Sequence, residues 1–398
     1  MALFRSFFHW RRFFMSLYSL LCPARIIAGP GSIESIAEVV ADFSVSRVLI
    51  ISDQGVARAG LIDHPKAVLE KAGVTVTVLD NTPPEPDVGQ VQAILNAARQ
   101  QSYELVIGIG GGSAMDVAKI VAVLLNNDVS LRDLLNKAPI VRRGIPTLMI
   151  PTTAGTGSEA TPNSILLVPE DELKIGIVSA KLMPDCVILD PKMTVGLPPA
   201  ITASTGMDAL THAIECYTSK KGNPFSELFA LKAITLISRS IRRAFTNGND
   251  LVARHDMMLG ALYGGMCIAT SSTTAVHALA YPLGGKYRIA HGISNAILLP
   301  YVMRFNMVGN ADKFRDIAMA MGLDVLSLTA ESAAHAMIDS LFALNRDMAI
   351  PADLKRWNIT AANLDTLVDG AAKVTRLLDN NPRPMNKNDI RAIYAQLI

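Results

Sequence analysis

The chain has 398 residues, of which 50% are hydrophobic and 18% are charged, and its formal net charge is +2. This length allows two domains with separate cores, and so small a net charge gives no sign of a basic face for a nucleic acid. No apolar run reaches the ~18 residues that a membrane span needs. The composition favours a large α/β enzyme over a nucleic-acid-binding or membrane-spanning protein.

The first 22 residues differ in composition from the rest of the chain. Arginines lie among many aromatic residues there, and no acidic residue precedes Glu34. We interpret residues 1–22 as an N-terminal extension outside the fold: a transit peptide, an amphipathic surface segment, or a stretch upstream of a start at Met15. The four cysteines show no CxxC spacing, which indicates reduced thiols and a cytoplasmic location.

Short apolar runs alternate with amphipathic stretches between residues 23 and 195. This alternation is typical of βαβ units that build a parallel sheet. We therefore expect residues 23–195 to form an α/β nucleotide-binding domain of Rossmann-like type. The pattern predicts strands at 47–52, 74–79, 105–109, 146–150 and 185–190, and helices at 88–100 and 114–125.

A glycine-rich turn follows the predicted strand at 105–109 and opens the next helix. It contains Gly110, Gly111, Gly112 and Ser113. Glycines let backbone N–H groups approach a diphosphate, and the helix N-terminus adds favourable partial charge. The turn lacks the GxGxxG pattern, so by itself it also fits a tight turn without a ligand. Asp116, in the helix that follows, could cap or orient this loop.

Asp53 stands at the end of the strand predicted at 47–52. An acidic residue at such a place can accept hydrogen bonds from the ribose hydroxyls of a dinucleotide. Its charge would also repel a 2′-phosphate, which favours NAD over NADP. The alternative is an ordinary turn residue at the end of a strand.

Helical periodicity dominates beyond about Pro191. It is interrupted only at residues 223–224, 247–249 and 350–351, where asparagine, glycine and proline gather. We expect residues 196–398 to form an all-α domain that binds a metal. Small-molecule sites commonly lie between domains, so the active site is expected in the cleft between the two.

One aspartate and three histidines form the most informative pattern of the chain. Asp208 and His212 are four residues apart, so on a helix they project from one face. His277 could add a ligand from a second helix, and His291 from a turn before Gly292. One carboxylate and three imidazoles suit Fe(II) or Zn(II) better than Mg(II) or Ca(II). The alternative is a chance group of surface or core histidines.

Taken together, these segments resemble the iron-containing (group III) alcohol dehydrogenase family. The similarity runs from about Pro23 to the C-terminus, in the family's order and spacing. It implies an NAD-dependent enzyme that transfers a hydride to or from a small alcohol or aldehyde, uses Fe(II) with Zn(II) possible, and forms a homodimer or larger homo-oligomer. The matching motifs are Asp208-Ala-Leu-Thr-His212, His277 with His291-Gly292, Gly110-Gly-Gly-Ser113 and Pro151-Thr-Thr-Ala-Gly-Thr-Gly-Ser-Glu159.

The resemblance also implies roles for residues outside the ligand set. The turn Gly110–Ser113 matches the family's diphosphate loop. Thr152, Thr153 and Thr156 match the loop that lines the dinucleotide cleft. Lys174 matches a lysine near the nicotinamide ribose, although a solvated lysine fits the sequence nearly as well.

Tyr281 departs from the family pattern, because many members carry a histidine four residues after the ligand that His277 matches. A phenol with an ordinary pKa of about 10 is a poorer proton carrier than histidine at neutral pH. We assign Tyr281 and the ligand His291 to the catalytic site, where Tyr281 either relays a proton or only shapes the pocket.

Three alternative functions are open at this point. Relatives with a tyrosine at the position of Tyr281 resemble hydroxyacid–oxoacid transhydrogenases, so that activity or semialdehyde reduction is one of them. Lys286 and Arg288 could contact an anionic aldehyde, or be solvated loop charges. The others are a dehydroquinate synthase-like lyase and a catalytically silent protein with the same fold.

Overall fold

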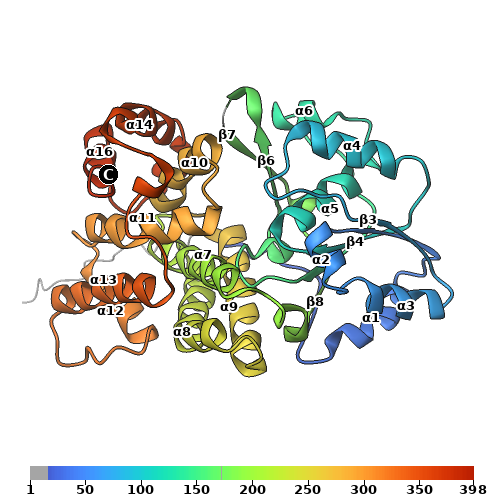
Figure 1. Cartoon of the computed structure of the whole chain (residues 1–398), viewed down its shortest axis with the longest axis horizontal. Coiled ribbons are helices and arrows are strands. Elements are labelled where there is room, and N and C mark those ends of the chain that lie inside the picture. Colours follow the sequence, from blue (N-terminus) through green and yellow to red (C-terminus); the bar gives the residue numbers. More distant parts are fainter. Residues whose placement is uncertain (1–16, 172) are drawn as a thin grey trace, which may run out of the picture.

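The computed structural model describes residues 17–171 and 173–398. Residues 1–16, which make up most of the expected N-terminal extension, lie outside the described residues. Residues 17–22 contain no helix or strand and lead into β1 (Arg25–Ala28). Figure 1 shows an α/β half built from the earlier part of the chain and a helical half built from the later part, side by side.

A parallel six-stranded sheet forms the centre of the α/β half, with the strand order β1-β8-β5-β4-β2-β3. All five strands predicted from the apolar runs are confirmed to within one residue at either end. They are β2 (Arg47–Ile51), β3 (Thr75–Leu79), β4 (Leu105–Gly110), β5 (Thr147–Pro151) and β8 (Cys186–Leu189).

Helices cover both faces of this sheet. Val48 and Ile50 of β2 belong to one core, with α1 and α3, whereas Leu49 and Ile51 belong to a second core, with α4 and α5. Side chains alternate across a strand, so a strand that is buried on both faces reads as a continuous apolar run. The helices of this half are α1 (Ile36–Asp42), α2 (Gln54–Arg58), α3 (Asp63–Lys71), α4 (Val88–Ala98), α5 (Gly112–Leu124) and α6 (Leu131–Leu135).

An antiparallel hairpin lies apart from the main sheet and was not expected from the sequence. It consists of β6 (Asn163–Val168) and β7 (Leu173–Val178). β7 contacts α10 of the helical half, so the hairpin stands where the two halves meet (Figure 1). The hairpin therefore forms one wall of the site described below.

The expectation of a helical second half is confirmed: beyond residue 191, every regular element among the described residues is a helix. Asn223 caps α8 by accepting hydrogen bonds from the backbone N–H groups of Phe225 and Ser226, which explains the predicted break. None of the described helices is long and apolar enough to cross a membrane. The helices are α7 (Pro199–Thr218), α8 (Pro224–Thr246), α9 (Leu251–Ser271), α10 (Ala275–Tyr287), α11 (His291–Asn306), α12 (Ala311–Ala320), α13 (Ala330–Asp347), α14 (Leu364–Ala372), α15 (Thr375–Leu378) and α16 (Lys387–Tyr394).

Two glycines bring the halves into direct backbone contact. A Cβ atom on Gly157, which has a φ of +62°, would lie 2.6 Å from the Cα atom of Gly265 in α9. A Cβ atom on Gly265 would lie 2.3 Å from the carbonyl oxygen of Gly157. No larger residue fits at either position without a backbone shift. The loop after β5 is thereby held against α9, beside the metal-ligand cluster.

Candidate functional site

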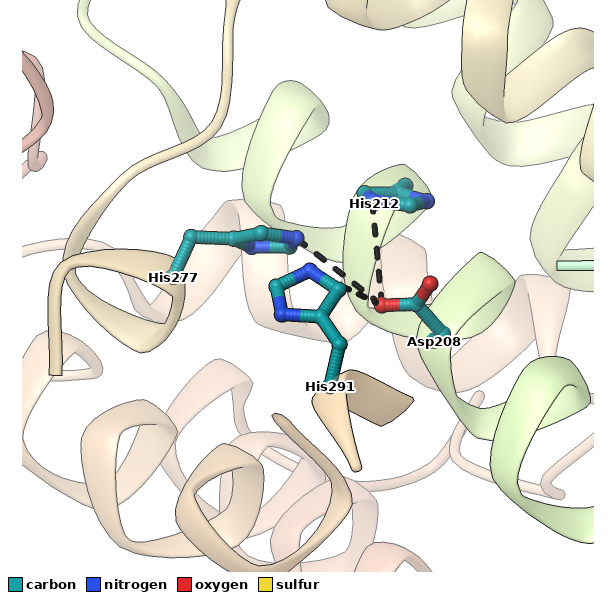
Figure 2. A group of neighbouring side chains, drawn as sticks. All are labelled: Asp208, His212, His277 and His291. Carbon is teal, nitrogen blue, oxygen red and sulfur yellow. Dashed lines mark ion pairs between the residues drawn. The ribbon is translucent and has the colours of Figure 1, made fainter. Parts of the chain in front are cut away.

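The four expected metal ligands come from three helices and converge on one point (Figure 2). Asp208 and His212 project from the same face of α7, as their spacing predicts, and His277 comes from α10. His291 was expected in a turn; this detail is wrong, because it is the first residue of α11. One ligand atom from each residue lies within 4.8 Å of all the others.

The distances within this cluster fit a single metal ion. Asp208 Oδ1 lies 3.8 Å from His212 Nε2, 3.9 Å from His277 Nε2 and 3.8 Å from His291 Nε2. Ligand atoms bound to one ion at about 2.0–2.2 Å are separated by distances of this order. A donor set of one carboxylate and three imidazoles suits Fe(II) or Zn(II).

Burial puts these groups in the protonation states that metal binding requires. Desolvation lowers the pKa of His212 to about 4 and that of His291 to about 3, so both rings are neutral at pH 7. Burial by itself would raise the pKa of Asp208, but the three facing imidazoles and the Asn295 amide lower it overall. The cluster therefore offers the Asp208 carboxylate and the neutral nitrogen lone pairs of His212 and His291.

Glu215 belongs to the sequence motif that begins at Asp208, but its role was not predicted from the sequence. Its Oε2 atom lies 2.5 Å from His277 Nδ1, on the side of the ring away from the cluster. Its Oε1 atom accepts hydrogen bonds from Thr274 Oγ1 and Val276 N, both at 2.6 Å. A fully buried carboxylate placed in this way fixes the orientation of a ligand imidazole and increases its basicity. The available signal was its spacing, since Glu215 lies seven residues after Asp208 on the same helix.

The sequence places Asn295 in a segment that resembles the family, but its role is seen only in the structure. It lies one turn after His291 on α11, and its amide nitrogen donates a 2.6 Å hydrogen bond to Asp208 Oδ1. The same nitrogen lies 3.1 Å from His277 Nε2 and 3.2 Å from His291 Nε2. Asn295 therefore contacts three of the four ligand side chains, and its hydrogen bond to Asp208 positions that carboxylate.

Gly292 explains how His291 comes so close to α7. A Cβ atom on Gly292 would lie 2.1 Å from the carbonyl oxygen of Ser204 and 3.4 Å from the Cβ atom of Asp208. Only glycine lets the start of α11 rest directly on α7 at this point. The sequence motif His291-Gly292 thus combines a ligand with the residue that positions it.

The expected cofactor residues gather at one edge of the sheet. Strands β2, β4 and β5 are parallel neighbours, so the segments after them share that edge. A Cβ atom on Gly110 would lie 3.3 Å from Asp53 Oδ2, and one on Gly112 would lie 2.7 Å from Thr156 Cγ2. No side chain caps α5 among the described residues, so its N-terminal amides are available to an anion.

Individual residues of this group have different surroundings. Asp53 Oδ1 caps α2 by accepting a 2.9 Å hydrogen bond from Val56 N. Thr152 is buried, and its amide donates to the carbonyl oxygen of Gly110. Thr153 lies beside Gly111, with its Cγ2 atom 3.5 Å from the position of a Cβ atom there.

Asp116 was expected to cap or orient the glycine turn; the cap is wrong, although Asp116 does line the same cavity as Gly112 and Ser113. Its carboxylate accepts hydrogen bonds from Ser158 Oγ at 2.5 Å and from Ile165 N at 2.9 Å, and it pairs with Lys119 at 2.9 Å. The turn that follows β4 is left uncapped, because Asp116 lies in the second turn of α5 and faces the loop after β5. Asp116 therefore ties that loop and the hairpin strand β6 to α5.

A cavity of about 380 Å³ connects the sheet edge with the metal-ligand cluster. Lys174 of β7 lies on its wall and forms a 2.7 Å ion pair with Glu85. Lys286 and Arg288, the cations considered for an anionic substrate, do not line this cavity in the described part of the chain. Other lining residues include Gly112, Ser113, Thr156, Tyr281 and the four metal-ligand residues.

Tyr281 faces the same cavity one turn after His277. Its ring centroid lies 6.3 Å from that of His291. Burial raises the pKa of the phenol, and the nearby carboxylates of Glu215 and Asp208 raise it further, against a lowering by Arg376. At neutral pH Tyr281 is therefore protonated and can donate a hydrogen bond but cannot act as a base.

The cavity joins a sheet edge of the kind that binds dinucleotides to a cluster of one carboxylate and three imidazoles. This combination is typical of a metal-dependent dehydrogenase. Profile comparison agrees with this class: residues 23–191 match "Iron-containing alcohol dehydrogenase", and residues 202–398 match "Fe-containing alcohol dehydrogenase family, C-terminal". The chain belongs to the iron-containing alcohol dehydrogenase family. It is an oxidoreductase that acts on alcohols or aldehydes and uses NAD and iron.

Individual relatives match over nearly the whole chain. Long-chain-alcohol dehydrogenase 1 of Geobacillus thermodenitrificans (strain NG80-2) is 39% identical over 383 residues, or 96% of each protein. A crystal structure of 1,3-propanediol oxidoreductase superposes with a TM-score of 0.92 at 33% identity, covering 96% of this chain and 100% of that one. Sulfoacetaldehyde reductase from Bifidobacterium kashiwanohense, solved with NAD+, has a TM-score of 0.85 at 29% identity, with 96% and 99% coverage.

Proposed function

We propose that Asp208, His212, His277 and His291 hold one Fe(II) ion, or Zn(II), at which a small alcohol or aldehyde reacts. The observation that carries this proposal is that the four ligand residues line the same cavity as the uncapped N-terminus of α5. One cavity could therefore receive both a substrate beside the four ligand residues and the dinucleotide.

Polarisation of the substrate oxygen and exchange of a hydride are the chemistry that a bound ion and a bound nicotinamide supply. The chain's own residues orient and insulate these groups. Glu215 and Asn295 fix the ligand side chains, and the glycine turn presents backbone amides to the diphosphate. Apolar side chains in the wall, such as Ile165, Leu167 and Ile268, keep water away from the reacting atoms.

The proposed function can be tested by reconstitution. The protein is stripped of metal with a chelator, reloaded with Fe(II) or Zn(II) without oxygen, and assayed with NAD+ and short alcohols, and with NADH and short aldehydes. We expect NAD-linked turnover only after reloading. Full activity in the stripped protein, shown to be metal-free by elemental analysis, would contradict the proposed metal centre.

We further propose that Asp53 makes the enzyme prefer NAD to NADP. Its Oδ2 atom faces the glycine turn, and repulsion of a 2′-phosphate costs on the order of 1–3 kcal/mol, or about one to two decades in kcat/KM. Asp53→Asn removes the charge and keeps an oxygen to cap α2, and we expect it to raise kcat/KM with NADP about tenfold. Equal kcat/KM for both dinucleotides in the unmodified enzyme would show that the ribose lies elsewhere.

Tyr281 is proposed to shape the substrate pocket rather than to carry the proton. Its phenol stays protonated at neutral pH, and its hydroxyl makes no hydrogen bond to another described residue. We expect Tyr281→Phe to change KM and the range of substrates, with kcat within about threefold of the unmodified value and metal content unchanged. A fall in kcat into the ~10²–10⁴ range of a general acid–base group would instead place Tyr281 on the proton route.

We also propose an oligomeric state, a location and a domain boundary for the protein. We propose a homodimer or larger homo-oligomer, supported by β1, an edge strand that pairs only with β8 among the described strands. All four cysteines are free, which supports a location in the reducing cytoplasm.

We place the boundary between the two domains near residue 195, between the end of β8 and the start of α7.

A further inference from the structure

The cavity has a wall made entirely by the helical half. This helical wall consists of Lys221, which follows α7, residues 268–273 at the end of α9, and Arg376 of α15. It lies on the same cavity as Tyr281 and the ligand cluster, and none of its residues belongs to the sheet edge that receives the dinucleotide. A substrate bound at the metal would therefore extend along this wall.

Charge is distributed unevenly over the cavity. Lys174 pairs with Glu85 at 2.7 Å, and Asp116 pairs with Lys119 at 2.9 Å. Within the described residues, the Lys221 ammonium and the Arg376 guanidinium have no carboxylate partner within 4.0 Å, so the helical wall carries two uncompensated positive charges.

The Arg376 guanidinium lines the same cavity as Tyr281 and the metal-ligand cluster. Its Nη1 atom donates a 3.2 Å hydrogen bond to Ser272 Oγ. Burial raises the pKa of the Tyr281 phenol, and the positive charge of Arg376 opposes that rise. The guanidinium is therefore close enough to act on a group that lies one helical turn from the ligand His277.

A buried asparagine fixes the helical wall in place. The Asn380 amide nitrogen donates to the carbonyl oxygens of residues 271–273 at 3.0–3.3 Å, and Asn380 Oδ1 accepts a 3.3 Å hydrogen bond from Lys221 N. Asn380 is only 2% exposed. Ser272 is held at a φ of +69°, which non-glycine residues seldom adopt. These contacts join the three segments that carry the wall and hold the backbone of Lys221, while the side chains of Lys221 and Arg376 are exposed at the cavity.

We propose that Arg376 and Lys221 bind a carboxylate at the end of the substrate remote from the reacting carbon. The preferred substrates are then short aldehyde acids and hydroxy acids rather than neutral alcohols. A guanidinium binds a carboxylate through two parallel hydrogen bonds, and an ammonium adds a third charged donor. This inference deepens the proposed function and rests on it, since the metal centre would hold the other end of the same molecule.

The kinetic test compares succinic semialdehyde with its methyl ester and with butanal, using the reconstituted enzyme and NADH. We expect the unmodified enzyme to favour the acid over the ester by about tenfold or more in kcat/KM. Arg376→Gln combined with Lys221→Gln should abolish this preference, by lowering kcat/KM for the acid about tenfold or more. Lys220→Gln is the matched control, because the Lys220 ammonium donates to the Asp379 carbonyl oxygen and does not line the cavity.

A binding measurement gives a readout that does not depend on turnover. Succinate, but not the neutral succinamide, should raise the Tm of the unmodified protein and of Lys220→Gln, and should leave the Tm of the double variant unchanged. Turnover of butanal without any preference for the acid would overturn this inference and leave the dehydrogenase function standing. A double variant that changes only the KM for NADH would overturn it as well, by assigning the cations to the dinucleotide. Absence of NAD-linked turnover with every substrate would instead contradict the proposed function.

Discussion

Replacement of His277 with alanine is expected to remove most of the bound metal and to abolish NAD-linked turnover. The imidazole is one of the four residues that would hold the ion, and the loss of one protein ligand weakens metal binding strongly. The fold should persist, because Glu215 keeps its hydrogen bonds from Thr274 and Val276 after the imidazole is lost. Elemental analysis gives the metal content, and circular dichroism checks the fold.

A matched control for this variant is His335→Ala, an exposed histidine of α13 outside the cluster. It should retain both metal and activity. Full metal occupancy in the folded His277→Ala protein would remove His277 from the ligand set and overturn the proposed centre.

Glu215→Gln is expected to weaken metal binding by about 10–100-fold, the usual cost of losing a partner that orients a ligand. The substitution keeps the size of the side chain but removes the charge that faces His277 Nδ1. It also replaces one carboxylate oxygen, an acceptor, with an NH₂ group, a donor. That donor must face either the His277 N–H or the donors of Thr274 and Val276, so at least one hydrogen bond is lost. Competition with a chelator of known affinity measures the loss in the folded protein.

Glu227→Gln provides the comparison for Glu215→Gln, because Glu227 pairs with Lys313 away from the ligand cluster. Its metal affinity should equal that of the unmodified protein. An unchanged affinity in Glu215→Gln would mean that His277 is oriented by the backbone of α10 alone.

The ligand set could be predicted because two kinds of local pattern coincide in it. Asp208 and His212 share a helix face by their spacing, and Gly292 marks where α11 packs on α7. The strands were predictable for a related reason, since both faces of the sheet are covered and each strand reads as an apolar run. The β6–β7 hairpin was missed because its two strands pair with each other and lie outside the βαβ alternation that builds the main sheet.

The sequence by itself determined the two-part organisation, the family and the residue types of the metal centre, because periodicity and spacing are local properties of a chain. Only the tertiary structure decided which partners these residues meet. Asp116 faces the loop after β5 and not the glycine turn, and Glu215 lies behind His277. Arg376, not Lys286 or Arg288, reaches the cavity. Each of these contacts joins residues far apart in the sequence, and such contacts depend on how helices and strands pack, which no local pattern records.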